Sequence, residues 1–208
     1  GDDSLLGGDG SDTLAGGAGV DTLAGGAGDD DIALSGADVV SGGSGDDVFS
    51  LDPTDSAADI TATVDGGTDA TSGNPDDAAN GDAGDVLDLS AGTSPQTIVL
   101  GANPETGTVN GLDADAGVDL TFTEIERILT GSGNDTIAGS GATGPVNVDT
   151  GAGNDVVTLQ RHQDHRGRLH EVLDLRIERL ARDMRVVLAE DLRAEARHFA
   201  ADDGKAGL

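Results

Sequence analysis

Single apolar residues recur at intervals of about nine along the first 50 residues, each between small or polar side chains. Residues 7–15, 16–24 and 25–33 follow one another without a gap, as GGDGSDTLA, GGAGVDTLA and GGAGDDDIA. Six positions of each unit are rich in glycine and favour turns, whereas the last three place one apolar residue in an extended, strand-like context. The pattern therefore predicts a repeat of turn and short strand.

One aspartate marks the same position in every unit, with glycine two residues before it and an apolar residue two residues after it. A unit shortened by one residue runs over 34–41, with Leu34 in place of the second glycine, and full units return at 42–50, 130–138 and 150–158. The aspartates that share this context are Asp3, Asp12, Asp21, Asp30, Asp38, Asp47, Asp135 and Asp155. Such a regular context indicates a repeat architecture.

Two units together predict one full turn of a coil, with a short strand on each side. Successive turns would stack as parallel strands about 4.8 Å apart. The repeat aspartates would then stack in columns, Asp3 with Asp21 and Asp38, Asp12 with Asp30 and Asp47, and Asp135 with Asp155. We expect an all-β chain built as a parallel β-roll, that is, a β-solenoid.

Charge and composition narrow the ways in which such a coil can be stable. The chain has 40 acidic and 11 basic residues, a formal net charge of −29, 1% aromatic residues and no cysteine. An excess of negative charge argues against nucleic acid and anionic membranes as partners, and disulfides are excluded. Stacked carboxylates repel and each turn buries little apolar surface, so the stabiliser must be a cation.

The repeat offers oxygen ligands, which suit calcium. Ca²⁺ takes 6 to 8 oxygens at about 2.3–2.6 Å, Mg²⁺ demands stricter octahedral geometry, and Zn²⁺ prefers His or Cys, which the repeats lack. Glycine turns can point their carbonyls inward beside the aspartates. The candidate ligands are Asp3, Gly8, Gly10, Asp12, Gly17, Gly19, Asp21, Gly26, Gly28, Asp30, Asp38, Gly43, Gly45, Asp47, Gly131, Gly133, Asp135, Gly151, Gly153 and Asp155.

These residues resemble a known family. GGxGxD followed by x, an apolar residue and x is the signature of the RTX, or hemolysin-type, calcium-binding repeat. The resemblance implies a calcium-loaded parallel β-roll and export through a type I secretion apparatus, with folding on meeting calcium outside the cell. Residues 81–130 resemble the longer, irregular coils between repeat blocks of such proteins, so we expect an irregular β-rich middle.

The last part of the chain differs from the rest. Ten of the 11 basic residues and all four histidines lie in 161–208. Apolar residues spaced by three and four predict an amphipathic α-helix over about 164–198. This helix could cap the roll, self-associate or dock a partner, link to a further domain, or be a junction artefact. A transition-metal site at His162, His165 and His170 is a weak alternative, because arginines surround it.

Other motifs give little support for catalysis, and we expect no catalytic residue. Residues 113–124 approach an EF-hand loop, but Val118 stands where the turn needs glycine. Ser44 fails the nucleophile-elbow pattern. The expected segments are a first roll block (1–52), the irregular middle with an acidic Gly/Asp loop (53–128), a second roll block (129–160) and the helical tail (161–208). The preferred function is a secreted calcium-binding structural module; an adhesive or surface-layer protein, and an appendage of a secreted hydrolase or epimerase, are the alternatives.

Overall fold

A computed structural model describes residues 1–52, 60–68, 84–113, 117–139, 141–142, 146–159, 175–176 and 185–188. These residues form strands and turns without any helix. The strands are β1 (Ser4–Asp9), β2 (Thr13–Ala15), β3 (Thr22–Ala27), β4 (Asp31–Leu34), β5 (Val39–Ser44), β6 (Val48–Leu51), β7 (Ala62–Thr68), β8 (Val86–Asp88), β9 (Thr97–Leu100), β10 (Gly107–Asn110), β11 (Leu120–Thr123), β12 (Arg127–Leu129), β13 (Thr136–Gly139), β14 (Val146–Asp149), β15 (Val156–Leu159), β16 (Leu175–Arg176) and β17 (Arg185–Leu188).

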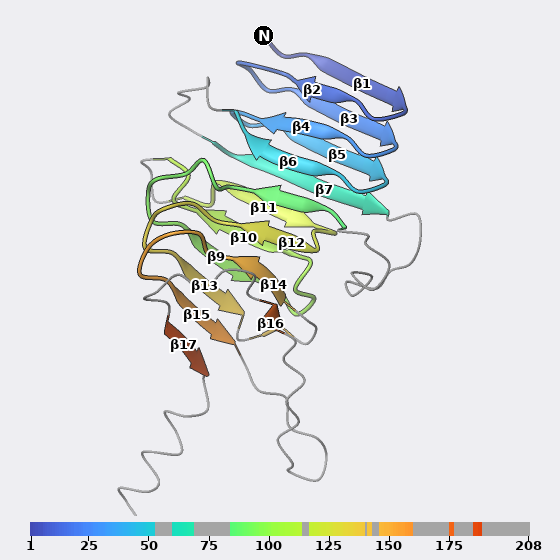
Figure 1. The fold of residues 1–208 in the computed structure, drawn as a ribbon. Helices are drawn as coiled ribbons and strands as arrows, with labels where there is room; N and C mark the ends of the chain where they lie inside the picture. The colour runs from blue at the N-terminus through green and yellow to red at the C-terminus, as the bar shows by residue number, and fades with distance from the viewer. Residues whose placement is uncertain are drawn as a thin grey trace, which may run out of the picture.

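The strands form two sheets that run the length of the molecule (Figure 1). Sheet A has ten strands in the order β1-β3-β5-β7-β11-β10-β9-β13-β15-β17, and sheet B has seven in the order β16-β14-β12-β8-β6-β4-β2. Consecutive strands of each repeat block alternate between the sheets, and neighbours within a sheet are parallel there. The prediction of an all-β chain with parallel strands is confirmed.

The strand register follows the repeat. Leu5 pairs with Leu23, which pairs with Val40, so the apolar positions of successive turns lie side by side in sheet A. Leu14, Ile32 and Phe49 do the same in sheet B. Two nine-residue units make one turn, and the step from Leu23 to Val40 is one residue shorter because it spans the shortened unit.

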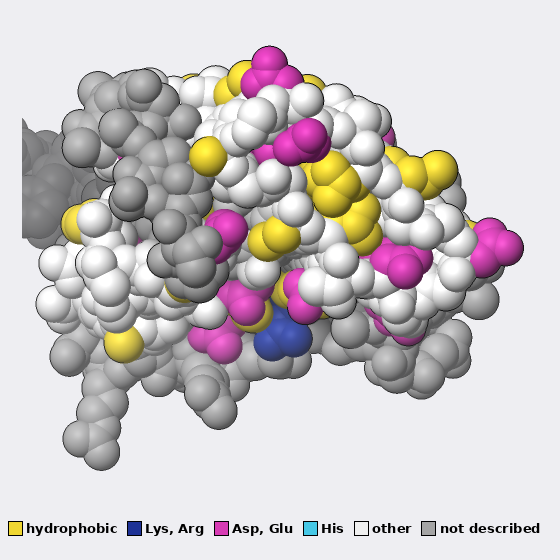
Figure 2. All heavy atoms as spheres, turned by 90° about the horizontal axis from the view of Figure 1, so that it is seen from above, with side chains coloured by type: hydrophobic (Ala, Val, Ile, Leu, Met, Phe, Trp, Pro, Cys, Tyr) yellow, Lys and Arg dark blue, Asp and Glu magenta, His cyan; other side chains and the backbone are white. Residues whose placement is uncertain are grey.

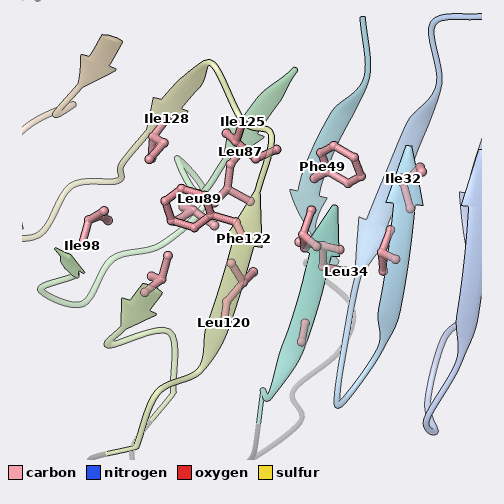
Figure 3. Packing of buried hydrophobic residues seen from close by; sticks show 14 of the residues in the cluster. Ile32, Leu34, Phe49, Leu87, Leu89, Ile98, Leu120, Phe122, Ile125 and Ile128 are labelled. Carbon is pink, nitrogen blue, oxygen red and sulfur yellow. The ribbon is translucent and has the colours of Figure 1, made fainter. Parts of the chain in front are cut away.

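The apolar columns of the two sheets face each other and form one continuous core (Figure 3). Ile32, Phe49 and Leu87 from sheet B are fully buried, as is Val64 from sheet A. The core is narrow, because each short strand contributes one or two inward side chains while its other residues face outward. Leu34 adds a buried side chain where the other units carry glycine, so the shortened unit gives the core an extra residue.

The middle of the chain departs from the simple coil. β10 is antiparallel to both β9 and β11, whereas β11 lies parallel to β7 and β9 lies parallel to β13. This meander widens sheet A, while in sheet B β8 pairs directly with β6 and β12. The two sheets therefore remain continuous through the irregular region.

The tail differs from the prediction at the six residues that the structure describes. Two short strands, Leu175–Arg176 and Arg185–Leu188, extend sheets B and A. We expected helix at these positions, as part of a helix over 164–198. The remainder of the expected helix, and the histidine cluster, lie outside the described residues. The open edge of a sheet offers unpaired N–H and C=O groups to a further strand, and the apolar run 186–188 suits a strand. Within the described part of the chain, no helix is long and apolar enough to cross a membrane.

Candidate metal sites

The repeat aspartates form hydrogen-bonded ladders from one turn to the next. The backbone N–H of Asp12 donates to Oδ1 of Asp30 over 2.8 Å, and the N–H of Asp30 donates to Oδ1 of Asp47 over 2.8 Å. The other column follows the same rule, since the N–H of Asp21 donates to Oδ1 of Asp38 over 2.9 Å. Asp3 begins this column through its own N–H, which donates to Asp21. The predicted columns are therefore present, and each aspartate uses one oxygen to hold the turn before it.

The ladder continues past the repeats that the sequence revealed. The N–H of Asp47 donates to Oδ1 of Asp85 over 2.8 Å, and the N–H of Asp85 donates to Oε2 of Glu126 over 2.7 Å. Each of these acids precedes a buried apolar residue by two positions, as Asp85 precedes Leu87. This two-residue spacing is the sequence signal that could have identified Asp85 and Glu126 as ladder residues. It was hidden because residues 69–83 interrupt the unit that begins at Gly66.

A third ladder lies in the second block and starts from glutamine. The N–H of Gln96 donates to Oδ1 of Asp135 over 2.8 Å, and that of Asp135 donates to Asp155 over 2.9 Å. Gln96 precedes the buried Ile98 by two, so it occupies the aspartate position of a degenerate unit. Its amide nitrogen donates to the carbonyl of Leu89 over 3.1 Å. This unit thus replaces the carboxylate with a neutral group.

The second carboxylate oxygen of most ladder aspartates is buried and has no hydrogen-bond partner. A buried carboxylate oxygen without a partner is costly unless a donor or a cation meets it. Desolvation by this burial raises the pKa of Asp47 to about 6, and it also raises the pKa of Asp135. The oxygens concerned are Oδ2 of Asp12, Asp21, Asp30, Asp47, Asp135 and Asp155.

The first glycine of a unit makes room beside this oxygen. A Cβ built on Gly16 would collide with Oδ2 of Asp21, and one on Gly25 would collide with Oδ2 of Asp30. A side chain at either position would therefore fill the space beside the carboxylate.

The glycines at the second and fourth positions of a unit bring carbonyl oxygens to the same turns. Gly26 has a φ of 123°, and a Cβ there would meet the carbonyl oxygen of Gly8, one turn back. Gly43 repeats the relationship with Gly26. Positive φ is found at all the glycines expected to bear ligands except Gly131 and Gly133, namely Gly8, Gly10, Gly17, Gly19, Gly26, Gly28, Gly43, Gly45, Gly151 and Gly153.

Among the described residues, side chains alone do not supply enough ligands to surround a metal ion. No group of three carboxylate or histidine side chains converges among the residues described. Buried carboxylate oxygens beside glycine carbonyls form a donor set of oxygen only, which is the chemistry that Ca²⁺ prefers. The residues present therefore fit calcium, provided that main-chain oxygens supply much of the shell.

The shortened unit departs from this arrangement. Oδ2 of Asp38 accepts the N–H of Ser35 over 3.1 Å and lies 3.2 Å from its hydroxyl oxygen. The same hydroxyl donates to the carbonyl of Gly17 over 2.6 Å. Ser35, rather than Leu34, thus contacts Gly17, the glycine at the second position of the unit one turn earlier.

Outside the ladders, some acidic residues face solvent and others hold main chain. Asp29, next to Asp30, is exposed, and its Oδ1 accepts the N–H of Asp46 over 3.2 Å. Figure 2 shows acidic side chains spread over the face seen from above, with few basic ones among them. In the EF-hand-like segment, Oδ2 of Asp113 accepts the N–H of Ile60 and Oδ2 of Asp119 accepts the N–H of Leu112. Those two carboxylates hold main chain, as in a polar loop.

Comparison with known proteins agrees with the geometry. The family model described as RTX calcium-binding nonapeptide repeat matches residues 1–32, 32–52 and 122–143, in four copies. A search of curated proteins finds no significant match. RTX nonapeptide repeats bind Ca²⁺ and are a structural, non-catalytic module. Residues 1–52 and 122–143 of the chain therefore contain RTX-type calcium-binding nonapeptide repeats.

Proposed function

We propose that this chain is a secreted module whose glycine turns and ladder aspartates bind calcium, and that binding drives its folding outside the cell. The observation that carries the proposal is the set of six buried carboxylate oxygens without a hydrogen-bond partner. All six belong to aspartates at the repeat position, and none lies elsewhere among the described carboxylates. A cation is the partner that such oxygens lack.

Asp12, Asp21, Asp30, Asp47, Asp135 and Asp155 would supply the charged ligands. Carbonyls of the glycines at the second and fourth positions would supply neutral ones, as in the pair Gly26 and Gly28. The bound ion would supply positive charge, which offsets repulsion between stacked carboxylates and joins successive turns. Asp3 lies at the exposed start of its column and is a weaker candidate.

Coupling of binding to folding follows from the location of the ligands. The stacked carboxylates come together only when successive turns are in register, so the unfolded chain has no such site. An ion that binds the folded form alone stabilises it in proportion to the logarithm of its free concentration. Such a chain would remain unfolded at low calcium and fold at high calcium.

An extracellular location is supported by this linkage and by the family. RTX repeat proteins are typically secreted by type I secretion, and calcium is scarce inside cells and abundant outside. The absence of cysteine and the net charge of −29 are compatible with a module that depends on cations rather than disulfides.

Circular dichroism during a calcium titration at constant ionic strength tests the proposal. We expect a change from coil to β-structure with calcium and a much smaller change with magnesium at the same concentration. Equal folding with magnesium, or no dependence on either ion, would contradict it.

A matched pair of variants separates ligand loss from loss of charge. Asp30→Ala removes a buried ladder carboxylate, and Asp29→Ala removes its exposed neighbour with the same change in charge. The first should shift the calcium midpoint upward by tenfold or more, and the second should leave it nearly unchanged. The double variant Asp12→Ala/Asp30→Ala should abolish the transition at millimolar calcium.

A further inference from the structure

The turn at Asp38 differs from the turns at Asp12, Asp21, Asp30 and Asp47 in how its carboxylate is satisfied. Oδ1 of Asp38 accepts the N–H of Asp21 over 2.9 Å, as in the other turns. Oδ2, which lacks a partner in the neighbouring ladder aspartates, here accepts the N–H of Ser35 over 3.1 Å. Asp38 and Ser35 are both buried, with 0% and 1% of their surface exposed.

The Ser35 hydroxyl also occupies the space between two potential ligands. Its oxygen lies 2.6 Å from the Gly17 carbonyl oxygen and 3.2 Å from Oδ2 of Asp38. Calcium would have to approach both oxygens to about 2.3–2.6 Å. A calcium ion in contact with both would therefore displace the hydroxyl. It would also meet the positive end of the Ser35 N–H.

The deletion in this unit explains why serine reaches that position. Residues 34–41 form a unit of eight, so the turn before Asp38 is one residue tighter than the turn before Asp21. Only Gly36, with a φ of 47°, adopts positive φ in this turn, whereas Gly17 and Gly19 both do so one turn earlier. The carboxylate column also ends here. Val39 pairs with Thr63 in sheet A, so the next turn has Ala62 at the position equivalent to Asp38.

From this geometry we infer that Ser35 closes the Asp38 turn in place of a calcium ion, so that this turn binds no metal. The inference rests on the proposed calcium function, because it divides the ladder aspartates into those that hold an ion and one that does not. Asp38 was a candidate ligand by its position in the repeat, and its role becomes that of a hydrogen-bond acceptor within the protein. The roll would then contain one turn whose closure is independent of calcium.

The number of calcium ions bound by the full chain tests the inference. Asp38→Asn and Asp30→Asn are matched, because both aspartates are buried and both accept a backbone N–H from the preceding turn, Asp38 from Asp21 and Asp30 from Asp12. Equilibrium dialysis with radioactive calcium should give fewer ions for Asp30→Asn and an unchanged number for Asp38→Asn. An equal loss in both variants, with circular dichroism showing that Asp38→Asn is folded, overturns the inference.

A second measurement needs no variant. Crystals of the unaltered chain grown with terbium, which replaces calcium and has a strong anomalous signal, should show a peak beside Oδ2 of Asp30 and none beside Oδ2 of Asp38. A peak within coordination distance of Asp38 overturns the inference even if the Asp38→Asn variant fails to fold. If the unaltered chain binds no calcium at all, the proposed function fails instead, so the two failures are distinct.

Discussion

The backbone N–H of Asp47 donates to Oδ1 of Asp85 over 2.8 Å, although 38 residues separate the two along the chain. The same step takes 17 residues between Asp30 and Asp47. Gly43 pairs with Gly67 in sheet A, and Phe49 pairs with Leu87 in sheet B, so the unit is resumed in register after residues 69–83. The ladder is thus a property of stacked turns and tolerates an insertion within one of them.

We predict that Asp85→Ala destabilises the calcium-bound protein by roughly 1–3 kcal/mol, because it leaves the buried Asp47 N–H without its acceptor. Asp88→Ala serves as the control, since that carboxylate accepts only from the exposed local N–H of Ser90. Urea denaturation at saturating calcium measures both. Equal stability of the two variants would show that the ladder does not extend past the insertion.

Core burial gives a second prediction with a matched pair. Leu23 of β3 is 1% exposed, and Leu6 of the neighbouring β1 is 75% exposed. Leu23→Ala should cost roughly 2–5 kcal/mol, and Leu6→Ala should cost little, because only the first leaves a cavity. The proposed coupling of folding to binding predicts that Leu23→Ala also raises the calcium concentration at the folding midpoint. Similar midpoints for the two variants would contradict the assignment of the core.

The close approach of successive turns predicts different effects at equivalent glycines. Gly8 and Gly26 have similar positive φ values, 109° and 123°. A Cβ at Gly8 meets nothing within 4 Å, whereas a Cβ at Gly26 collides with the Gly8 carbonyl. Gly8→Ala should therefore carry only the backbone strain, roughly 1–2 kcal/mol, and Gly26→Ala should be markedly worse. Thermal melts in calcium measure the difference, and equal melting temperatures would argue against carbonyl stacking.

Calcium affinity should depend on pH through Asp47. Desolvation by burial raises the pKa of Asp47 from 3.8 to about 6. Protonation therefore stabilises the calcium-free fold, fully below about pH 4, and this stabilisation is lost as the pH rises through about 6. Calcium must displace that proton, so its apparent affinity at this site should fall roughly tenfold between pH 7 and pH 5.

Calcium titrations at pH 5, 6 and 7.5 measure this dependence, with Asp47→Asn as the comparison. The variant should bind less calcium and lose part of the pH dependence. An affinity that does not change between pH 5 and pH 7.5 would contradict a proton and a calcium ion sharing the Asp47 carboxylate.

Much of the roll could be predicted from the repeat itself. A period of nine with one apolar residue fixes which side chains face inward, and the pairing of Leu14 with Ile32, and of Ile32 with Phe49, follows directly. The aspartate columns follow from the same register. The division of the chain into four segments, and the ligand role of each glycine, remain predictions.

What could not be predicted depends on loop lengths and on side chains that replace a repeat residue. Glu126 joins the ladder by accepting the Asp85 N–H, at a position where the repeat has aspartate. Ser35 substitutes hydrogen bonds for an ion only because the unit lost one residue. The antiparallel meander of β9, β10 and β11 has no nine-residue signal, and it joins the first repeat block through the parallel pairing of β11 with β7.

Hydrogen–deuterium exchange of the backbone amides, followed by mass spectrometry with and without calcium, tests the central claim most directly. We predict that the amides of β1 to β6 are strongly protected in millimolar calcium and exchange at nearly random-coil rates in excess chelator. The ladder N–H groups of Asp12, Asp30 and Asp47 should show the largest change. Equal protection of these strands in chelator would mean that the roll is stable without the ion and would contradict calcium-dependent folding.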